Sequence, residues 1–168
     1  PYRGEKNTNW EGGFRVPMLA RWPGHIEAGR VSNAVISQLD WLPTLMAAAG
    51  EPGVREKLLA GHRADAKTFK VHLDGYDFLP YLTASTPAPA PRRDFFYFSD
   101  DGKLLGLRTG DWKFVFAEQR ARRFDVWRDP FVDLRIPKLF NLRRDPFERA
   151  DTDANSHNVW WDHKIGAL

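Results

Sequence analysis

The chain has 168 residues, 42% of them hydrophobic, which suffices for one domain or for a small domain and part of another. The net charge of +3 comes from 25 basic and 22 acidic residues, and no nucleic-acid-binding motif accompanies the basic stretch at residues 120–123, so composition argues against a nucleic-acid-binding protein. The absence of Cys excludes disulfides and thiolate chemistry, and no apolar run approaches the ~18 residues of a membrane span.

The N-terminal part of the sequence predicts a loop followed by two short strands. The sequence begins with Pro1 instead of Met, and no apolar signal core follows. We therefore expect the chain to come from the interior of a longer polypeptide. Residues 1–13 are polar and rich in Gly and Asn, which predicts a surface loop. Residues 14–22 are apolar with an interior Pro17, which is typical of an edge or irregular strand, and residues 33–37 predict a second strand.

A helix is predicted next, from Asp40 as N-cap to Gly50 as the left-handed stop. Residues 54–60 and 78–82 predict two further short helices. The apolar stripe of the first helix consists of Leu42, Leu45 and Met46.

The second half of the chain has the alternation of strands. Residues 83–91 are rich in Pro and Ala and predict a stiff, extended connector. Asp100-Asp101-Gly102 and Gly110-Asp111 are hairpin signals, and the tail after Asp151 is expected to be helical. An antiparallel sheet of about four strands follows, at residues 95–98, 104–108, 112–117 and 138–142.

The most specific information lies in short motifs. Residues 4–17, Gly-Glu-Lys-Asn-Thr-Asn-Trp-Glu-Gly-Gly-Phe-Arg-Val-Pro, resemble the second signature of the sulfatase family, Gly-x-Lys-x-x-x-x-Glu-Gly-Gly-x-Arg-x-Pro. Further matches to the family follow in its order and cover nearly the whole chain, at residues 22–24, 37–45, 74–77, 139–142 and 145–148. The chain therefore resembles the C-terminal portion of an arylsulfatase-like protein of the alkaline-phosphatase-like superfamily.

The resemblance implies an α/β fold class, α+β within this segment. Residues 1–83 are expected to be the C-terminal end of the sulfatase catalytic domain, and residues 84–93 the Pro/Ala connector. Residues 94–168 are expected to form a C-terminal subdomain around the antiparallel sheet. A sheet cut at this position leaves apolar surface exposed, so we expect the isolated chain to associate.

Lys6 is the site residue that the resemblance indicates, both catalytic and substrate-binding. Sulfatases direct a lysine at this position toward a sulfate oxygen, where a fixed cation stabilises charge that builds up during sulfuryl transfer. Glu11 and Arg15 are assigned a scaffolding role as an ion pair, and Gly12 and Gly13 a tight turn.

The chain lacks other parts that the family needs. Sulfatases use a formylglycine, made from Cys or Ser in a Cys/Ser-x-Pro/Ala-x-Arg motif, and a calcium ion. The run at residues 85–89 has Pro where Arg is required. We expect the calcium ligands and the formylglycine upstream of this chain, and no metal ligand within it. Asp100-Asp101 is interpreted as a hairpin turn and not as a calcium site. The resemblance allows it a place at the substrate entrance, which loops of the C-terminal subdomain line in this family. The scattered histidines are interpreted as surface or packing residues: His25, His62, His72, His157 and His163.

The predicted parent protein is a sulfuric ester hydrolase acting on an aryl or carbohydrate sulfate, and the chain alone is expected to be inactive. Two alternatives stay open. One is a phosphate or phosphonate ester hydrolase of the same superfamily. The other is a non-catalytic module that binds sulfated glycans through Arg108, Arg122 and Arg123. The resemblance also favours a periplasmic or secreted location.

Overall fold

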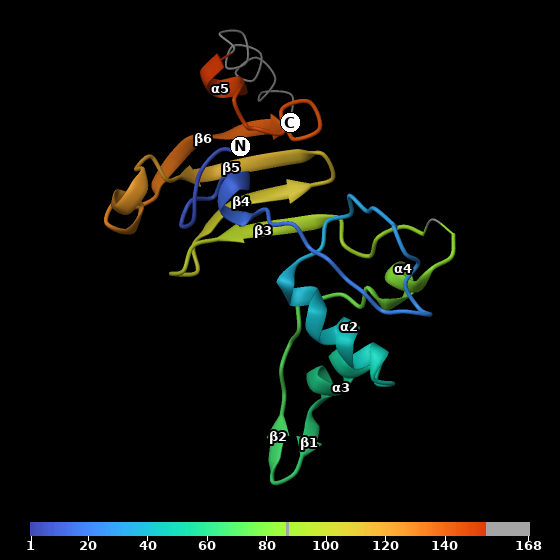
Figure 1. Cartoon of the computed structure of the whole chain (residues 1–168). Coiled ribbons are helices and arrows are strands. Elements are labelled where there is room, and N and C mark those ends of the chain that lie inside the picture. The colour runs from blue at the N-terminus through green and yellow to red at the C-terminus, as the bar shows by residue number, and fades with distance from the viewer. Residues whose placement is uncertain (87, 154–168) are drawn as a thin grey trace. The chain divides into compact units, whose positions relative to one another are not determined.

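The computed structural model describes residues 1–86 and 88–153, and the chain divides into two compact units (Figure 1). The sheet unit combines Pro1–Met18 with Asp94–Leu168, and the helical unit is Leu19–Arg93. By compactness the first 18 residues thus belong with the sheet, although the sequence grouped them with residues 19–83. The assignment of residues 1–83 to the end of a catalytic domain stays a prediction.

The sheet unit contains a four-stranded antiparallel sheet in the order β3-β4-β5-β6. This confirms the predicted sheet and its hairpin turns. At the β3–β4 turn Gly102 has φ 78° and donates its N–H to the Ser99 carbonyl, and at the β4–β5 turn Gly110 has φ 55°. The strands are β3 Asp94–Phe98, β4 Leu104–Thr109, β5 Trp112–Glu118 and β6 Val132–Asn141, the last beginning earlier than predicted.

The N-terminal segment lies against this sheet (blue in Figure 1), and the surface loop predicted for residues 1–13 extends only to residue 7. Residues 8–11 are buried, and α1 spans Glu11–Phe14. The strand predicted at residues 14–22 is also wrong, since the chain after α1 has no regular structure up to residue 22. Tertiary packing of Trp10 accounts for the buried part of the segment. Its ring contacts Phe140 edge-on, with centroids 6.0 Å apart, in a core that includes Val115.

Three short elements complete the described part of the sheet unit. They are α1, the 3₁₀ helix η2 Arg123–Trp127 and α5 Ala150–Asp153. The helix expected after Asp151 is therefore present as far as Asp153, and the remaining tail, with His157 and His163, lies outside the described residues.

The helical unit confirms the three predicted helices. The 3₁₀ helix η1 Gln38–Asp40 leads into α2 Trp41–Ala48, and α3 Val54–Ala60 and α4 Leu79–Thr83 follow. The strand predicted at residues 33–37 is absent, because that stretch forms no ladder. A small hairpin that the sequence did not predict pairs β1 His62–Ala64 with β2 Lys67–Phe69.

Asp40 organises the helical unit without capping α2 in the predicted way. Its side chain accepts from the Ser37 N–H at 2.8 Å, as the second half of a capping box for η1. The same carboxylate accepts from the Tyr76 N–H at 2.8 Å and from the Arg92 guanidinium at 2.6 and 2.8 Å. Asp40 and Arg92 are both buried, so this bidentate pair links three distant stretches of the unit.

The apolar stripe predicted on α2 is largely solvent-exposed. Leu42 and Leu45 are 49% and 61% exposed, and the buried side of α2 consists of Pro43, Thr44 and Ala47. We therefore predict that the isolated chain self-associates through the exposed leucines. Sedimentation velocity should show oligomers that dissociate in the double variant Leu42→Glu/Leu45→Glu. A monodisperse monomer of the unchanged chain at micromolar concentration is the contrary result.

None of the helices within residues 1–86 and 88–153 is long and apolar enough to span a bilayer.

Candidate functional site

Lys6 lies at the tip of a tight loop in the sheet unit, and its side chain is exposed. The loop is closed by Glu5 and Thr8: the Thr8 N–H and hydroxyl donate to the Glu5 carbonyl at 3.0 and 2.6 Å, and the Glu5 N–H donates back to the Thr8 hydroxyl at 3.1 Å. Asn7 has φ 67°, a left-handed conformation that Asn tolerates better than most residues. The backbone under Lys6 is therefore set by local hydrogen bonds.

Glycines let the chain fold back on this loop. A Cβ on Gly12 would lie 2.5 Å from the carbonyl oxygens of Arg3 and Gly4, and one on Gly13 would lie 2.5 Å from that of Thr8. Both contacts are far closer than carbon and oxygen tolerate, so only glycine fits here. Gly12 and Gly13 lie in the single turn of α1, so glycine is required here by the close approach of the backbone rather than by the predicted tight turn of a loop.

The Lys6 loop is also hydrogen-bonded to η2. The Asn7 side-chain N–H donates to the Val126 carbonyl at 2.6 Å, and the Arg123 N–H donates to the Glu5 carboxylate at 2.6 Å. The Lys6 ammonium lies over the Trp127 ring, 5.7 Å from its centroid. Lys6 thus lies on a surface formed by its own loop and η2, which are hydrogen-bonded to each other.

Beneath the loop a buried ionic network fixes α1 to the sheet. Lys113 on β5 is fully buried, and its ammonium is 3.2 Å from the Glu11 carboxylate and 2.7 Å from that of Glu148. The Tyr97 hydroxyl donates to Glu11 at 2.6 Å, and the Glu11 N–H donates to Glu148 at 2.7 Å. Arg108 lies 3.7 Å from Glu11 at the edge of this network. Removing one partner of a buried ion pair is strongly destabilising, so this network holds α1 against the sheet.

The two carboxylates of this network differ in pKa. Burial by itself raises the pKa of Glu11, but Lys113, the Tyr97 hydroxyl and Arg108 outweigh it and hold the pKa below its usual 4.5. For Glu148 burial dominates and raises the pKa, although Lys113 and the Glu11 N–H act against it. Burial and the Glu11 carboxylate also raise the pKa of Tyr97, which keeps its hydroxyl a donor.

The ion pair predicted between Glu11 and Arg15 is wrong. Glu11 turns inward to Lys113, and the Arg15 guanidinium lies 4.6 Å from the centroid of the Tyr2 ring. Sequence reasoning missed Lys113 and Glu148 altogether. One signal was available for Glu148: it lies in the motif at residues 145–148 that already stood out.

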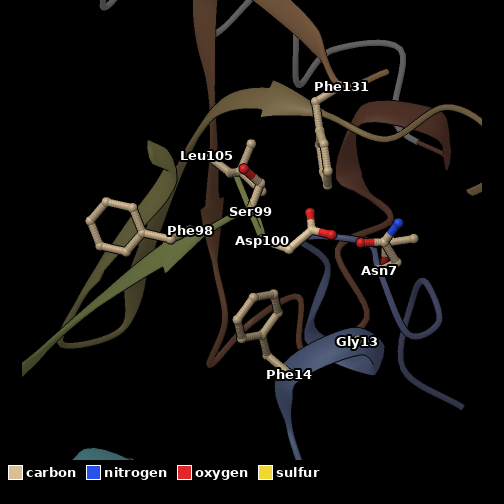
Figure 2. A pocket seen from close by; sticks show the side chains of 9 residues that line it. Asn7, Gly13, Phe14, Phe98, Ser99, Asp100, Leu105 and Phe131 are labelled. Carbon is tan, nitrogen blue, oxygen red and sulfur yellow. The ribbon is translucent and has the colours of Figure 1, made fainter. Parts of the chain in front are cut away.

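A pocket of about 180 Å³ lies next to Asn7 in the sheet unit (Figure 2). We name it the Asp100 pocket. In Figure 2 the Asp100 carboxylate lies between the rings of Phe14 and Phe131, facing Asn7. Asp100 therefore does line a pocket beside the Lys6 loop. The pocket is lined by Asn7, Thr8, Gly13, Phe14, Phe98, Ser99, Asp100, Leu105 and Phe131.

The residues for the calcium ion and the formylglycine implied by the resemblance were expected upstream of this chain, and this stays a prediction. Within residues 1–86 and 88–153, no group of three or more His, Asp or Glu side chains is arranged to hold a metal ion. The full sequence has no Cys, and its run at residues 85–89 departs from the formylglycine motif. Lys6 is the site residue that the sequence predicts, and its ammonium lies against the Trp127 ring.

Comparison with known proteins identifies the family. Residues 1–51 match the sulfatase family model. Human arylsulfatase A is 36% identical over 153 residues, which cover 85% of this chain and 27% of that protein, and mouse steryl-sulfatase is 40% identical over 170 residues, covering 88% and 24%. The chain thus spans about a quarter of the length of the curated relatives it matches.

A solved structure agrees with these relatives in fold. The PsFucS1 sulfatase from Pseudoalteromonas sp. superposes with a TM-score of 0.72 and 26% identity, covering 99% of this chain and 32% of that one. Both the motif segment around Lys6 and the sheet unit fall within this coverage. The chain therefore belongs to the sulfatase family and corresponds to its C-terminal portion.

Proposed function

We propose that this segment is part of an arylsulfatase-like sulfuric ester hydrolase that converts a sulfate ester to free sulfate and an alcohol or phenol. In this proposal Lys6 contacts a sulfate oxygen. The observation that carries it is the fixed and exposed position of Lys6, closed locally by Glu5 and Thr8 and tied to Val126 through Asn7. Because the backbone of the loop is already held in place, less ordering is needed for the Lys6 ammonium to stabilise the charge that develops on sulfuryl oxygens.

The names of the relatives support the reaction class. They include arylsulfatases A and G, a steryl-sulfatase and an N-acetylgalactosamine-6-sulfatase, whose names span aryl, steryl and carbohydrate esters. What they share is the sulfate ester, and the proposal for this chain is limited to that group. Calcium, formylglycine and export from the cytoplasm belong to the proposal through the family alone, and the groups would be held by residues outside this chain.

We further propose that the 168-residue chain is inactive alone. Loss of a nucleophile costs on the order of 10⁶ in turnover in a well-studied hydrolase, and Lys6 supplies only charge stabilisation. The test is hydrolysis of 4-nitrophenyl sulfate by this chain and by the longer polypeptide that contains it. We expect turnover by the longer polypeptide and none above background by the chain. Turnover by the chain contradicts the inactivity, and preference of the longer polypeptide for phosphate diesters contradicts the sulfatase assignment.

The glycan-binding alternative has less support from the structure. Its first residue, Arg108, is directed to the Glu11 carboxylate at 3.7 Å and to the Gly110 carbonyl at 3.2 Å, and only 20% of its side chain is exposed. Arg108 is therefore engaged within the sheet unit, which leaves less of its charge available for a glycan.

A further inference from the structure

We propose that Trp127 is a positioning residue for Lys6: its ring holds the Lys6 ammonium in place without neutralising the charge. The inference rests on the proposed function, because it takes from that function the contact between Lys6 and a sulfate oxygen. It goes further by assigning a role at the same site to an aromatic residue of η2, which is far from Lys6 in the sequence.

The contact between the ammonium and the ring is direct. The Lys6 Nζ lies 5.7 Å from the centroid of the Trp127 ring, within the ~6 Å at which a cation is attracted to an aromatic face. Lys6 is exposed, and Trp127 is 56% exposed. The Trp127 ring is therefore not held by burial in a core, and its face is open to the cation.

The backbone brings the two side chains together through the residues next to them. Asn7 follows Lys6, and Val126 precedes Trp127. The Asn7 side-chain N–H donates to the Val126 carbonyl at 2.6 Å, and Val126 is itself buried. A hydrogen bond between the neighbours of the two residues thus places the ring beside the ammonium, so the contact is more than chance proximity of two long side chains.

Gln119 fixes the segment that carries the ring. Its buried side-chain amide donates to the Val126 carbonyl at 3.2 Å and to the Asp129 carbonyl at 2.8 Å. Its amide oxygen accepts from the Ala121 N–H at 2.9 Å. Trp127 lies between the two carbonyls that Gln119 binds, so the backbone is held on both sides of it. Less ordering of this segment is then needed when a ligand binds.

A ring suits an ammonium that has to act on a sulfate oxygen. Attraction to an aromatic face leaves the net charge of the ammonium unchanged, whereas a carboxylate would neutralise it. Two carboxylates close to the pair in sequence are directed to other partners. Glu5 accepts from the Arg123 N–H at 2.6 Å. Asp125 lies 3.7 Å from the Arg128 guanidinium.

The lysine also gains in order. A lysine side chain has many rotamers, and the ring restricts them before the substrate arrives. The ammonium has three donor hydrogens, so those that point away from the ring stay available for a sulfate oxygen.

The test is a double-mutant cycle on Lys6 and Trp127 in the longer polypeptide, with 4-nitrophenyl sulfate as substrate. Trp127→Leu should lower kcat/KM by about two- to fivefold, the loss of an exposed cation–π contact. In the Lys6→Ala background the same substitution should have no effect, because the cation is gone. Trp127→Phe keeps a weaker aromatic face, so its kcat/KM should fall between those of the unchanged enzyme and Trp127→Leu.

Phe124 provides the matched control, since it lies in the same 3₁₀ helix and is 81% exposed. Phe124→Leu should leave kcat/KM unchanged. If a thermal melt shows that Trp127→Leu is unfolded, Trp127→Phe takes its place in the cycle.

The inference is overturned if the Trp127 substitution has no effect, raises kcat/KM, or lowers it equally with and without Lys6. In each of these cases the proposed function stands, provided that Lys6→Ala still lowers kcat. If Lys6→Ala itself changes nothing, the sulfate contact of the proposed function fails, and the positioning role fails with it.

Discussion

Replacing Lys113 by Met should lower the free energy of unfolding by about 3–5 kcal/mol, the usual cost of removing one partner from a buried ion pair. Lys113 is fully buried between Glu11 and Glu148, both of which are buried too. Met fills most of the same space, so the loss reflects two carboxylates left without their cation. Urea denaturation followed by near-ultraviolet circular dichroism measures the change.

A surface pair provides the matched control. Lys103 pairs with Asp133 at 2.6 Å, but the two side chains are 42% and 74% exposed. Lys103→Met should therefore change the unfolding free energy by less than about 1 kcal/mol. Similar losses in the two variants would show that the buried position of Lys113 has no special role.

The pH dependence distinguishes loss of charge from loss of packing. In the unchanged chain Glu11 has a lowered pKa, so its contribution is present above the unfolded pKa near 4.5 and is lost as the pH falls. Glu148 has a raised pKa and contributes in the opposite sense. Without Lys113 the pKa values of Glu11 and Glu148 in the folded state rise. Both carboxyls can then remain buried at little cost once they are protonated. The deficit of Lys113→Met should therefore be smaller at pH 4 than at pH 7, whereas a packing defect would not change with pH.

Replacing Lys6 by Ala in the longer polypeptide should lower kcat for sulfate esters by about 10²–10³, with little change in the unfolding midpoint. The factor corresponds to loss of one preorganised donor to a developing oxyanion, about 2.7–4 kcal/mol. Stability should change little because Lys6 is exposed and its ammonium makes a surface cation–π contact with Trp127, which contributes about 0.5–1 kcal/mol. Steady-state kinetics together with a thermal melt measure both quantities.

The conservative variant refines this expectation. Lys6→Arg keeps the charge but offers a planar fork in place of a compact ammonium, so kcat should fall between those of the unchanged enzyme and Lys6→Ala. Lys103→Ala, an exposed lysine elsewhere in the sheet unit, should leave kcat unchanged. A kcat for Lys6→Ala within twofold of that of the unchanged enzyme would show that Lys6 has no catalytic role.

Local chemistry made the sheet and helices predictable. The strands of the sheet alternate and are joined by turns at Gly102 and Gly110, both of which adopt positive φ. Residues 33–37, with Ala-Val-Ile at their centre, also resemble a strand but form no ladder. The hairpin at residues 62–69 escaped prediction for the opposite reason, because all the residues of β1 and β2 are exposed and carry no alternation.

The core of the candidate site was not predictable because its partners are distant in sequence. Strand β5 places Trp112 and Phe114 on one side and Lys113 and Val115 on the other, and an alternating pattern of this kind favours the aromatic side as core. The structure shows the reverse, with Lys113 and Val115 fully buried and Trp112 39% exposed. Lys113 is buried because it pairs with Glu11 and Glu148, and the sequence of β5 itself gives no sign of these distant partners. Lys6 could be singled out because a family motif surrounds it.

The sheet unit is assembled from two stretches separated by the whole helical unit, and this sets the order in which the chain can mature during synthesis. Glu11 must wait for Lys113, 102 residues later, and for Glu148, 137 residues later. Closing such a span is slow compared with forming a hairpin. The ionic network that fixes α1 beneath the Lys6 loop can therefore form only after Glu148 has been synthesised, although the hydrogen bonds within the loop are local. A nascent chain that ends before β5 contains the motif at residues 4–17 but lacks the sheet against which that segment packs.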